Sequence, residues 1–290
     1  VEPASEIDRL RIEPTQATLG ARVTGCRLTE IGEDTWHSIE AAFHEHALLL
    51  FPGQHLSREE QVDFGRRFGE IEHLFGDAGW VPLSNQREDG SLLDDDAMPM
   101  QIMRGNEGWH TDSSYMALAA KASLLSAHVV PSRGGETGWA DMRAAYETLD
   151  DATRRRIADL SAYHSLVYSQ ARIGHRDAGD FGYGTDETEP PLRPLVKIHP
   201  VTGRPALYIG RHAYGIPGLA PAESERLLHQ LLDAACQPPR IYQHAWQPGD
   251  LAVWDNRCVL HRGRPYDHAQ ARVMIHTRIA GDPATERALA

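Results

Sequence analysis

Short runs of strand-forming residues, each ended by glycine, proline or aspartate, constrain the fold of this chain more than any other feature. Branched and aromatic residues favour strands, and the turn residues between the runs keep each strand short. The clearest runs are residues 122–130, 195–199, 206–209, 251–254, 259–262 and 272–279. Many short strands with few helices predict a mainly β fold with flanking helices around a double-stranded β-helix (jelly-roll) core.

Helices are indicated at only a few places. Residues 34–46 and 222–236 are predicted to be helical, the second because its leucines recur along one stripe. Ser57 with Glu60 three residues later matches a capping box, which predicts that a helix begins there. A short buried strand is expected at residues 47–51, where an apolar run ends at a proline and a glycine.

The chain has no internal repeat and no low-complexity linker, so we predict one domain over residues 1–290. Two stretches, 76–100 and 174–194, lack periodicity and are long for simple connections. Loops of that length often close over a binding site, so we expect active-site lids there. Surface insertions with no role in a site are the alternative.

Composition excludes several classes of function. A formal net charge of −12 argues against nucleic acid or an anionic membrane as partner. The three cysteines are odd in number and far apart, which argues against a disulfide framework, a zinc finger or an iron–sulfur cluster. With no export signal and no apolar run that could cross a bilayer, we expect a cytoplasmic protein. We also expect a homo-oligomer.

The segment from Trp109 to Tyr115 carries the strongest chemical signal. In an extended segment His110 and Asp112 point to the same side, so both can reach one cation. The alternative is a histidine and an aspartate that bond only to neighbouring backbone. A metal site needs a third ligand from elsewhere, and the candidates are His244, His261, His268 and His276.

His261 is the favoured third ligand. An apolar strand at 251–254 reaches a tight Asp-Asn-Arg turn, and a second strand is expected to return with His261, so we predict a hairpin that holds the imidazole rigidly. His244 and His268 stand in loop-like sequence and are expected at the surface. Two histidines and one carboxylate leave three positions open on the metal, the arrangement that Fe(II) oxygenases use, whereas structural zinc favours a closed tetrahedral set.

Several motifs in order resemble one enzyme family. WHTD at 109–112, GGET at 134–137 and WDNR at 254–257, with His261 following, are similar to the taurine dioxygenase family of Fe(II)/2-oxoglutarate enzymes. The likeness spans nearly the whole chain. Within the family, the segments 167–170, 192–197, 209–212 and 273–278 look most like the phenoxyalkanoate dioxygenases, particularly those that act on (S)-2-aryloxypropionates.

The resemblance implies Fe(II) as the metal, with 2-oxoglutarate and O₂ as cosubstrates. It implies that Arg272, eleven residues after His261, binds the distal carboxylate of 2-oxoglutarate, and that the Thr137 hydroxyl donates to the same group. Arginine suits this role because its planar fork binds a carboxylate with two hydrogen bonds and keeps its proton. A surface salt bridge for Arg272 and a turn hydroxyl for Thr137 are the structural alternatives.

The resemblance also implies a small anionic organic substrate, and no catalytic side chain beyond the metal ligands. Taurine itself is disfavoured, because His276 stands where the family arginine that binds the sulfonate would be. The residues expected to line the substrate pocket or contact the anion are Asn106, Ser113, Tyr115, Arg211, His276 and Arg278.

The function expected is hydroxylation of an aryloxyalkanoate, which then splits into a phenol and a keto acid while 2-oxoglutarate yields succinate and CO₂. An alkyl sulfate or sulfonate dioxygenase is the alternative within the family. A non-catalytic metal-binding jelly-roll sensor is the alternative from a different class, and it would not need Arg272 or Thr137. A hydrolytic metalloenzyme would need a general base beside a metal-bound water, and none of the motifs supplies one.

Overall fold

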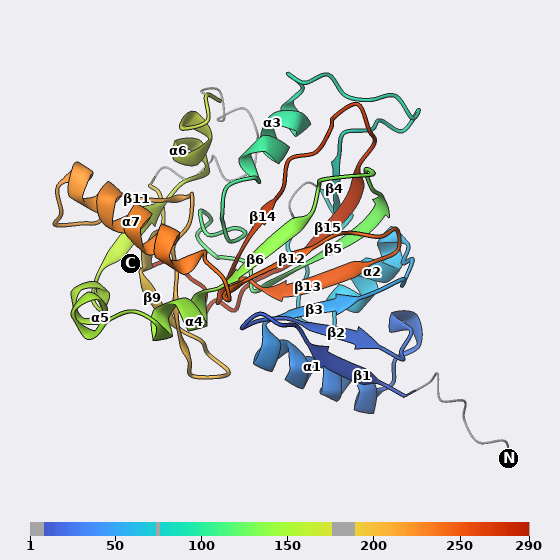
Figure 1. Cartoon of the computed structure of the whole chain (residues 1–290), viewed down its shortest axis with the longest axis horizontal. Helices are drawn as coiled ribbons and strands as arrows, with labels where there is room; N and C mark the ends of the chain where they lie inside the picture. The colour runs from blue at the N-terminus through green and yellow to red at the C-terminus, as the bar shows by residue number, and fades with distance from the viewer. Residues whose placement is uncertain (1–8, 74–75, 176–188, 290) are drawn as a thin grey trace, which may run out of the picture.

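The computed structural model describes residues 9–73, 76–175 and 189–289, and two β-sheets dominate this part of the chain (Figure 1). The larger sheet has seven strands, in the order Arg11–Pro14 (β1), Ala21–Thr24 (β2), Leu48–Phe51 (β3), Leu251–Asp255 (β13), Ala122–Val129 (β5), Val273–Ile279 (β15) and Val81–Ser84 (β4). The smaller sheet has three, in the order Ile241–His244 (β12), Thr137–Asp141 (β6) and Val259–Gly263 (β14).

Helices and short strands surround these sheets. The short strands are Ser161–His164 (β7), Leu192–Pro194 (β8) and Ala213–Tyr214 (β11) in one group, with Val196–Ile198 (β9) and Pro205–Leu207 (β10) as a separate pair. The helices are Glu33–His46 (α1), Arg58–Gly65 (α2), Met98–Gly105 (α3), Met142–Glu147 (α4), Asp151–Ile157 (α5), Leu166–Ala171 (α6) and Pro221–Ala235 (α7), with a 3₁₀ turn at Leu28–Glu30 (η2). Among the described residues, no helix has the length and apolar character needed to span a membrane.

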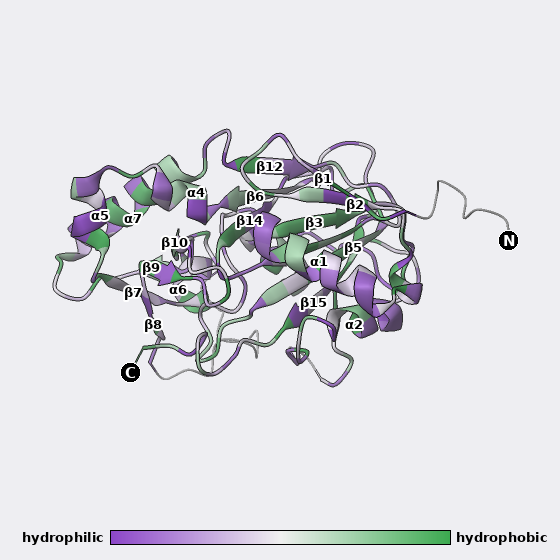
Figure 2. Cartoon of the chain, turned by 90° about the horizontal axis from the view of Figure 1, so that it is seen from below, coloured by the Kyte–Doolittle hydropathy of each residue, from purple (hydrophilic) through white to green (hydrophobic). Residues whose placement is uncertain are grey.

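Alternating side chains of β3 divide the interior into two cores. Leu48 and Leu50 belong to a cluster that includes Trp139 of the smaller sheet, so this face of the larger sheet packs on the smaller one. Leu49 and Phe51 point to the opposite face and pack under α1 and α2. Strand geometry explains the division, because successive side chains leave a strand on opposite sides. Figure 2 shows the strands at the centre as strongly hydrophobic, whereas α1 and α2 carry both hydrophilic and hydrophobic segments.

The prediction of a mainly β fold with flanking helices is confirmed. The helices expected at 34–46 and 222–236 are α1 and α7, within a residue at each end. The capping box is present: the Ser57 hydroxyl accepts a hydrogen bond from the Glu60 amide, and the Glu60 carboxylate accepts one from the Ser57 amide. Local sequence was sufficient in these places because each signal acts within one turn of helix.

The stretch 76–100 is more ordered than the sequence indicated. It contains β4, which pairs with β15 at the edge of the larger sheet, and the first turn of α3. Pro82 lies inside β4 and hides the strand pattern, yet an edge strand tolerates proline. Most of the second expected lid, 174–194, lies outside the described residues, and its last three residues form β8.

The predicted hairpin around residues 255–258 is wrong. β13 pairs with β3 on one side and β5 on the other, so it has no free edge for a returning strand. β14 instead joins the smaller sheet beside β6. The turn is therefore a corner that carries the chain from one sheet to the other, and His261 enters the smaller sheet.

The capping box gives a direct test of the start of α2. Replacing Ser57 with alanine removes the acceptor for the Glu60 amide, so the free energy of unfolding should fall by about 1 kcal/mol. Urea denaturation of the two proteins measures the difference. Ser57→Asp retains an acceptor and should match the wild type, and an equally stable Ser57→Ala protein would contradict the assignment.

Candidate metal centre and adjoining pocket

Backbone pairing brings His110 and His261 together. The two residues form an isolated antiparallel bridge, with the His110 amide donating to the His261 carbonyl at 3.0 Å and the His261 amide donating back at 2.7 Å. Their ring centroids are 4.1 Å apart. The segment that contains His110 therefore lies along β14 without being a long strand of its own.

Asp112 reaches the same place from a turn. The chain is extended at His110, but a turn begins at Asp112, and Ser113 follows in the left-handed region with φ of 53°. One carboxylate oxygen of Asp112, Oδ2, lies 3.6 Å from Nε2 of His261. One ligand atom from each of His110, Asp112 and His261 lies within 4.8 Å of the others, and all three residues are buried.

Both histidines are in the neutral form, which is the form that binds a metal. The Nδ1 of His110 lies 2.8 Å from the Gly108 carbonyl, which can only accept, so Nδ1 carries the proton and Nε2 keeps its lone pair. Burial lowers the pKa of His110 to about 4 and holds the pKa of His261 well below its ordinary value. Both rings are therefore neutral at pH 7.

Asp112 is ionised although it is buried. Burial alone would raise the pKa of its carboxyl, but the charge of Arg278 and a hydrogen bond from His276 hold that pKa well below the ordinary value. Arg278 Nη2 lies 3.0 Å from Oδ1, while His276 Nε2 lies 3.4 Å from Oδ2. Two neutral imidazoles and one carboxylate therefore meet at one point, which is the donor set that a divalent transition metal prefers.

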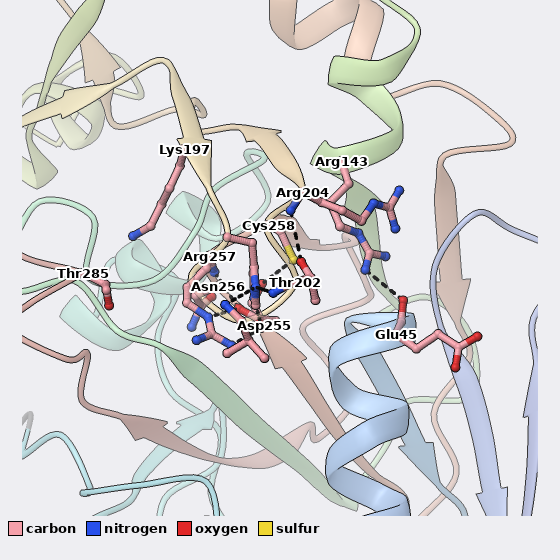
Figure 3. Close-up of polar contacts among 12 residues, drawn as sticks. Glu45, Arg143, Lys197, Thr202, Arg204, Asp255, Asn256, Arg257, Cys258 and Thr285 are labelled. Atoms are coloured by element: carbon pink, nitrogen blue, oxygen red, sulfur yellow. Dashed lines mark hydrogen bonds and ion pairs between the residues drawn. The ribbon is translucent and has the colours of Figure 1, made fainter.

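A second group with metal-binding residue types, among the described residues, is His44, His199 and Asp255. Both oxygens of Asp255 accept hydrogen bonds from Arg257, at 2.8 and 2.6 Å (Figure 3). The Nδ1 of His199 accepts from the amides of residues 201 and 202, so its Nε2 carries the proton and donates to Asp255. This group is already neutralised and contributes to structure, which leaves the His110 group as the candidate centre.

Arg272 lines the same pocket as His110, Asp112 and His261. Its side chain is 8% exposed and donates to the Gly135 carbonyl at 3.2 and 3.0 Å, with no carboxylate within 4.0 Å among the described residues. Gly134 and Gly135 allow this approach, since both have positive φ and a Cβ on Gly135 would lie 3.0 Å from Arg272 Nε. Burial lowers the pKa of Arg272 to about 10.

Thr137 lines the same pocket and starts β6. Its hydroxyl oxygen accepts a hydrogen bond from Trp246 Nε1 at 3.0 Å. The hydroxyl proton is therefore available to donate to a ligand. Arg272 and Thr137 together offer a buried cation and a donor, which suits a carboxylate.

Only some of the residues expected to contact the substrate line the pocket. Asn106, His276 and Arg278 line the pocket with the candidate ligands. Ser113 and Tyr115 do not line it but contact Arg278, through a hydrogen bond to the Ser113 hydroxyl at 3.2 Å and one to the Tyr115 side chain. Arg211 lines a neighbouring cavity, where its guanidinium donates to the Ser169 carbonyl and the Gln170 side chain.

Several pocket residues were not anticipated from the sequence. They come from α3 and its C-terminal end and from the segment after β14, and include Met103, Arg104, Glu107, Arg264, Tyr266 and His268. The proline in the first turn of α3 was a usable helix signal, but the acidic run before it suggested a loop. His268 was expected at the surface; it lines the pocket and pairs with Asp95 at 3.0 Å. His244 pairs with Asp250 and does not line this pocket.

Comparisons with known proteins agree with this geometry. A profile of the family described as taurine catabolism dioxygenase TauD, TfdA family matches residues 11–278. The (S)-phenoxypropionate/alpha-ketoglutarate-dioxygenase of Sphingobium herbicidovorans is 56% identical over 286 residues, 96% of this chain and 98% of that protein. The protein of the same name from Delftia acidovorans is 52% identical over 288 residues, 96% of this chain and 98% of its own length.

A solved structure is similar across the whole fold. The crystal structure of AAD-2 in complex with Mn(II) and N-oxalylglycine matches with a TM-score of 0.88 and 37% sequence identity. The match covers 97% of this chain and 99% of that one. The jelly-roll core and the resemblance indicated by the sequence motifs are thereby confirmed.

The unpaired charge of Arg272 predicts a gain of stability on its removal. Arg272→Met deletes a buried cation that has no carboxylate within 4.0 Å among the described residues, so the free energy of unfolding of the ligand-free protein, measured with urea, should rise by about 1 kcal/mol. Arg66→Met is the control, since the Arg66 side chain is 63% exposed and its removal should leave stability nearly unchanged. A less stable Arg272→Met protein would show that the guanidinium is already compensated.

Proposed function

The chain belongs to the TauD/TfdA family of dioxygenases, and from that premise we propose that it uses Fe(II), O₂ and 2-oxoglutarate to hydroxylate a small aryloxyalkanoate. The protein is an oxidoreductase. The observation that carries the proposal is one pocket lined by two neutral histidines, an ionised aspartate and a buried arginine that has no carboxylate within 4.0 Å among the described residues. A metal-sensing jelly roll would have no use for that arginine.

His110, Asp112 and His261 are the proposed ligands of the iron. When bound, the iron supplies the O₂ chemistry, in the positions that a two-histidine, one-carboxylate set leaves open. The chain's own contribution is to present neutral imidazoles and an ionised carboxylate at neutral pH. All three side chains are buried and line one pocket.

Arg272 and Thr137 are the proposed cosubstrate residues. The guanidinium of Arg272 provides the counter-charge for the distal carboxylate of 2-oxoglutarate, and the Thr137 hydroxyl adds a hydrogen bond. The relative named as binding N-oxalylglycine supports this, because that compound differs from 2-oxoglutarate only by an NH in place of a CH₂. The two named relatives also carry alpha-ketoglutarate, the same compound as 2-oxoglutarate, in their names.

The proposed substrate is an aryloxyalkanoate, such as the phenoxypropionate named for the two relatives. Its carboxylate needs hydrogen-bond donors, and two lie in the pocket lining: Arg278, which also pairs with Asp112, and His276. Ser113 and Tyr115 support the substrate by holding Arg278, and Asn106 forms part of the wall. Arg211 stays a second candidate for an anion contact, from the neighbouring cavity.

Hydroxylation on the carbon between the ether oxygen and the carboxylate explains the products. The product is a hemiketal from a propionate, or a hemiacetal from an acetate. It collapses by breaking the bond to the ether oxygen, which leaves as a phenol when it takes up a proton. The carbon that carried the hydroxyl becomes a keto acid, or glyoxylate from the acetate, so the net reaction is ether cleavage.

We also propose a single domain over residues 1–290, a cytoplasmic location and a homo-oligomer. The single family match over residues 11–278 and the core shared by both sheets support one domain. Three unpaired cysteines suit a reducing compartment. Ile198 and Val201, 60% and 59% exposed around the end of β9, are apolar residues that an oligomer contact would cover.

The substrate assignment is tested by product analysis. The purified protein with Fe(II), ascorbate, air and 2-oxoglutarate should release phenol from one enantiomer of dichlorprop, matched mole for mole by succinate. The comparison panel is the other enantiomer, 2,4-dichlorophenoxyacetate, an alkyl sulfate and a sulfonate. No phenol but brisk sulfite or aldehyde release would place the enzyme in the sulfur-releasing branch, and no succinate from any compound would favour a sensor.

The third ligand is tested by separating His261 from His276. Succinate formation should disappear in His261→Ala, because the metal loses one of its three ligands. His276→Ala should retain succinate formation while coupling to phenol release weakens, since His276 lines the pocket without belonging to the ligand group. Full activity of His261→Ala would make His276 the third ligand instead.

A further inference from the structure

Asn256 lies at the corner between the two sheets and contacts Asp112 of the candidate centre. Its side chain is 1% exposed, in the turn that links β13 to β14 (Figure 3). The Oδ1 atom accepts hydrogen bonds from Trp254 Nε1 at 3.0 Å and from the Asp112 amide at 3.3 Å. Because both groups can only donate, the atom that faces them must be the amide oxygen.

This orientation determines the direction of the next two hydrogen bonds. The Nδ2 of Asn256 faces the Ser123 hydroxyl at 2.8 Å, and an amide NH₂ can only donate. The Ser123 oxygen is therefore an acceptor on that side, and its proton points to Oδ2 of Asp112, 2.6 Å away. Ser123 is completely buried, so water does not compete for this proton.

The two oxygens of Asp112 consequently have different partners. Oδ2 accepts a hydrogen bond from the Ser123 hydroxyl and faces His261 and His276, whereas Oδ1 is paired with Arg278. A carboxylate with a hydrogen-bond donor on each of its two oxygens resists rotation about its bond to Cβ. Only the oxygen on the side of His261 is then presented to the ligand group.

We propose that Asn256 and Ser123 are positioning residues, which act through one directed chain of hydrogen bonds to make Asp112 a ligand through a single oxygen. This inference rests on the proposed metal site. A carboxylate can bind a cation through one oxygen or through both. Binding through both would occupy a further position, and the cosubstrate and O₂ need the three positions that single-oxygen binding leaves.

Removing the Ser123 hydroxyl tests the proposal, with Mn(II) as the probe because it does not oxidise in air. The dissociation constant is measured by the electron paramagnetic resonance signal of free Mn(II), and 2-oxoglutarate affinity is then measured on the Mn(II)-loaded protein. Ser123→Ala should weaken Mn(II) binding by about 10-fold to 100-fold, as loss of an outer hydrogen-bond partner does. Its affinity for 2-oxoglutarate should fall as well.

Ser126→Ala is the matched control. Ser126 lies on the same strand, β5, and is 3% exposed, but its hydroxyl bonds to His128 and not to the centre. Both variants lose one buried hydroxyl, so their unfolding midpoints should fall by similar amounts while only Ser123→Ala loses Mn(II) affinity. Equal Mn(II) affinity in Ser123→Ala and the wild type would overturn the proposal, and so would an equal loss in both variants.

Asn256→Ala completes the test. If Asn256 acts through Ser123, the loss of Mn(II) affinity on changing both residues should be smaller than the product of the two separate losses. Fully multiplicative losses would overturn the directed chain. His110→Ala distinguishes this outcome from failure of the metal site itself: if it binds Mn(II) as well as the wild type, the proposed ligands are wrong, whereas its loss of binding with an unaffected Ser123→Ala overturns only the positioning role.

Discussion

The two backbone hydrogen bonds between His110 and His261 are the contact on which the rest of the site depends. They fix the register between the loop that contains His110 and strand β14, which are far apart in the sequence, and so bring the two imidazoles together. Side-chain contacts alone would not fix this register. The corner between β13 and β14 makes the pairing possible, because it delivers His261 to the smaller sheet rather than back along the larger one.

Burial then divides the charged groups around the centre into two kinds. Asp112 is surrounded by Arg278, two histidines and a serine hydroxyl, so its charge is compensated before any metal binds. Arg272 is buried, donates to the Gly135 carbonyl and lies over the Tyr266 ring, and the described residues place no carboxylate within 4.0 Å of it, although Glu136 acts on its charge from further away. A paired anion and a cation without an ion-pair partner in one pocket favour a ligand that brings a carboxylate of its own.

The sequence predicted those features whose cause is local. The capping box at Ser57 and the amphipathic stripe of α7 each follow from residues within a few positions of one another. The missed elements have non-local causes. β4 contains Pro82 and is a strand only because β15 offers it an edge, and the turn at 255–258 is a corner only because β3 and β5 already occupy both sides of β13.

By itself, the sequence determined the kinds of groups available to the site: the histidines, the aspartate and the arginine, in an order that resembles one enzyme family. Their chemistry is a property of the side chains and needs no fold to be recognised. Only the tertiary structure decided their states and partners, because protonation, charge pairing and hydrogen-bond direction depend on burial and on neighbours remote in sequence. It buried His110 and so made its imidazole neutral, paired Arg278 with Asp112, and placed the Asn256 amide within hydrogen-bond distance of Ser123. Each of these depends on sheets that pair residues more than a hundred positions apart.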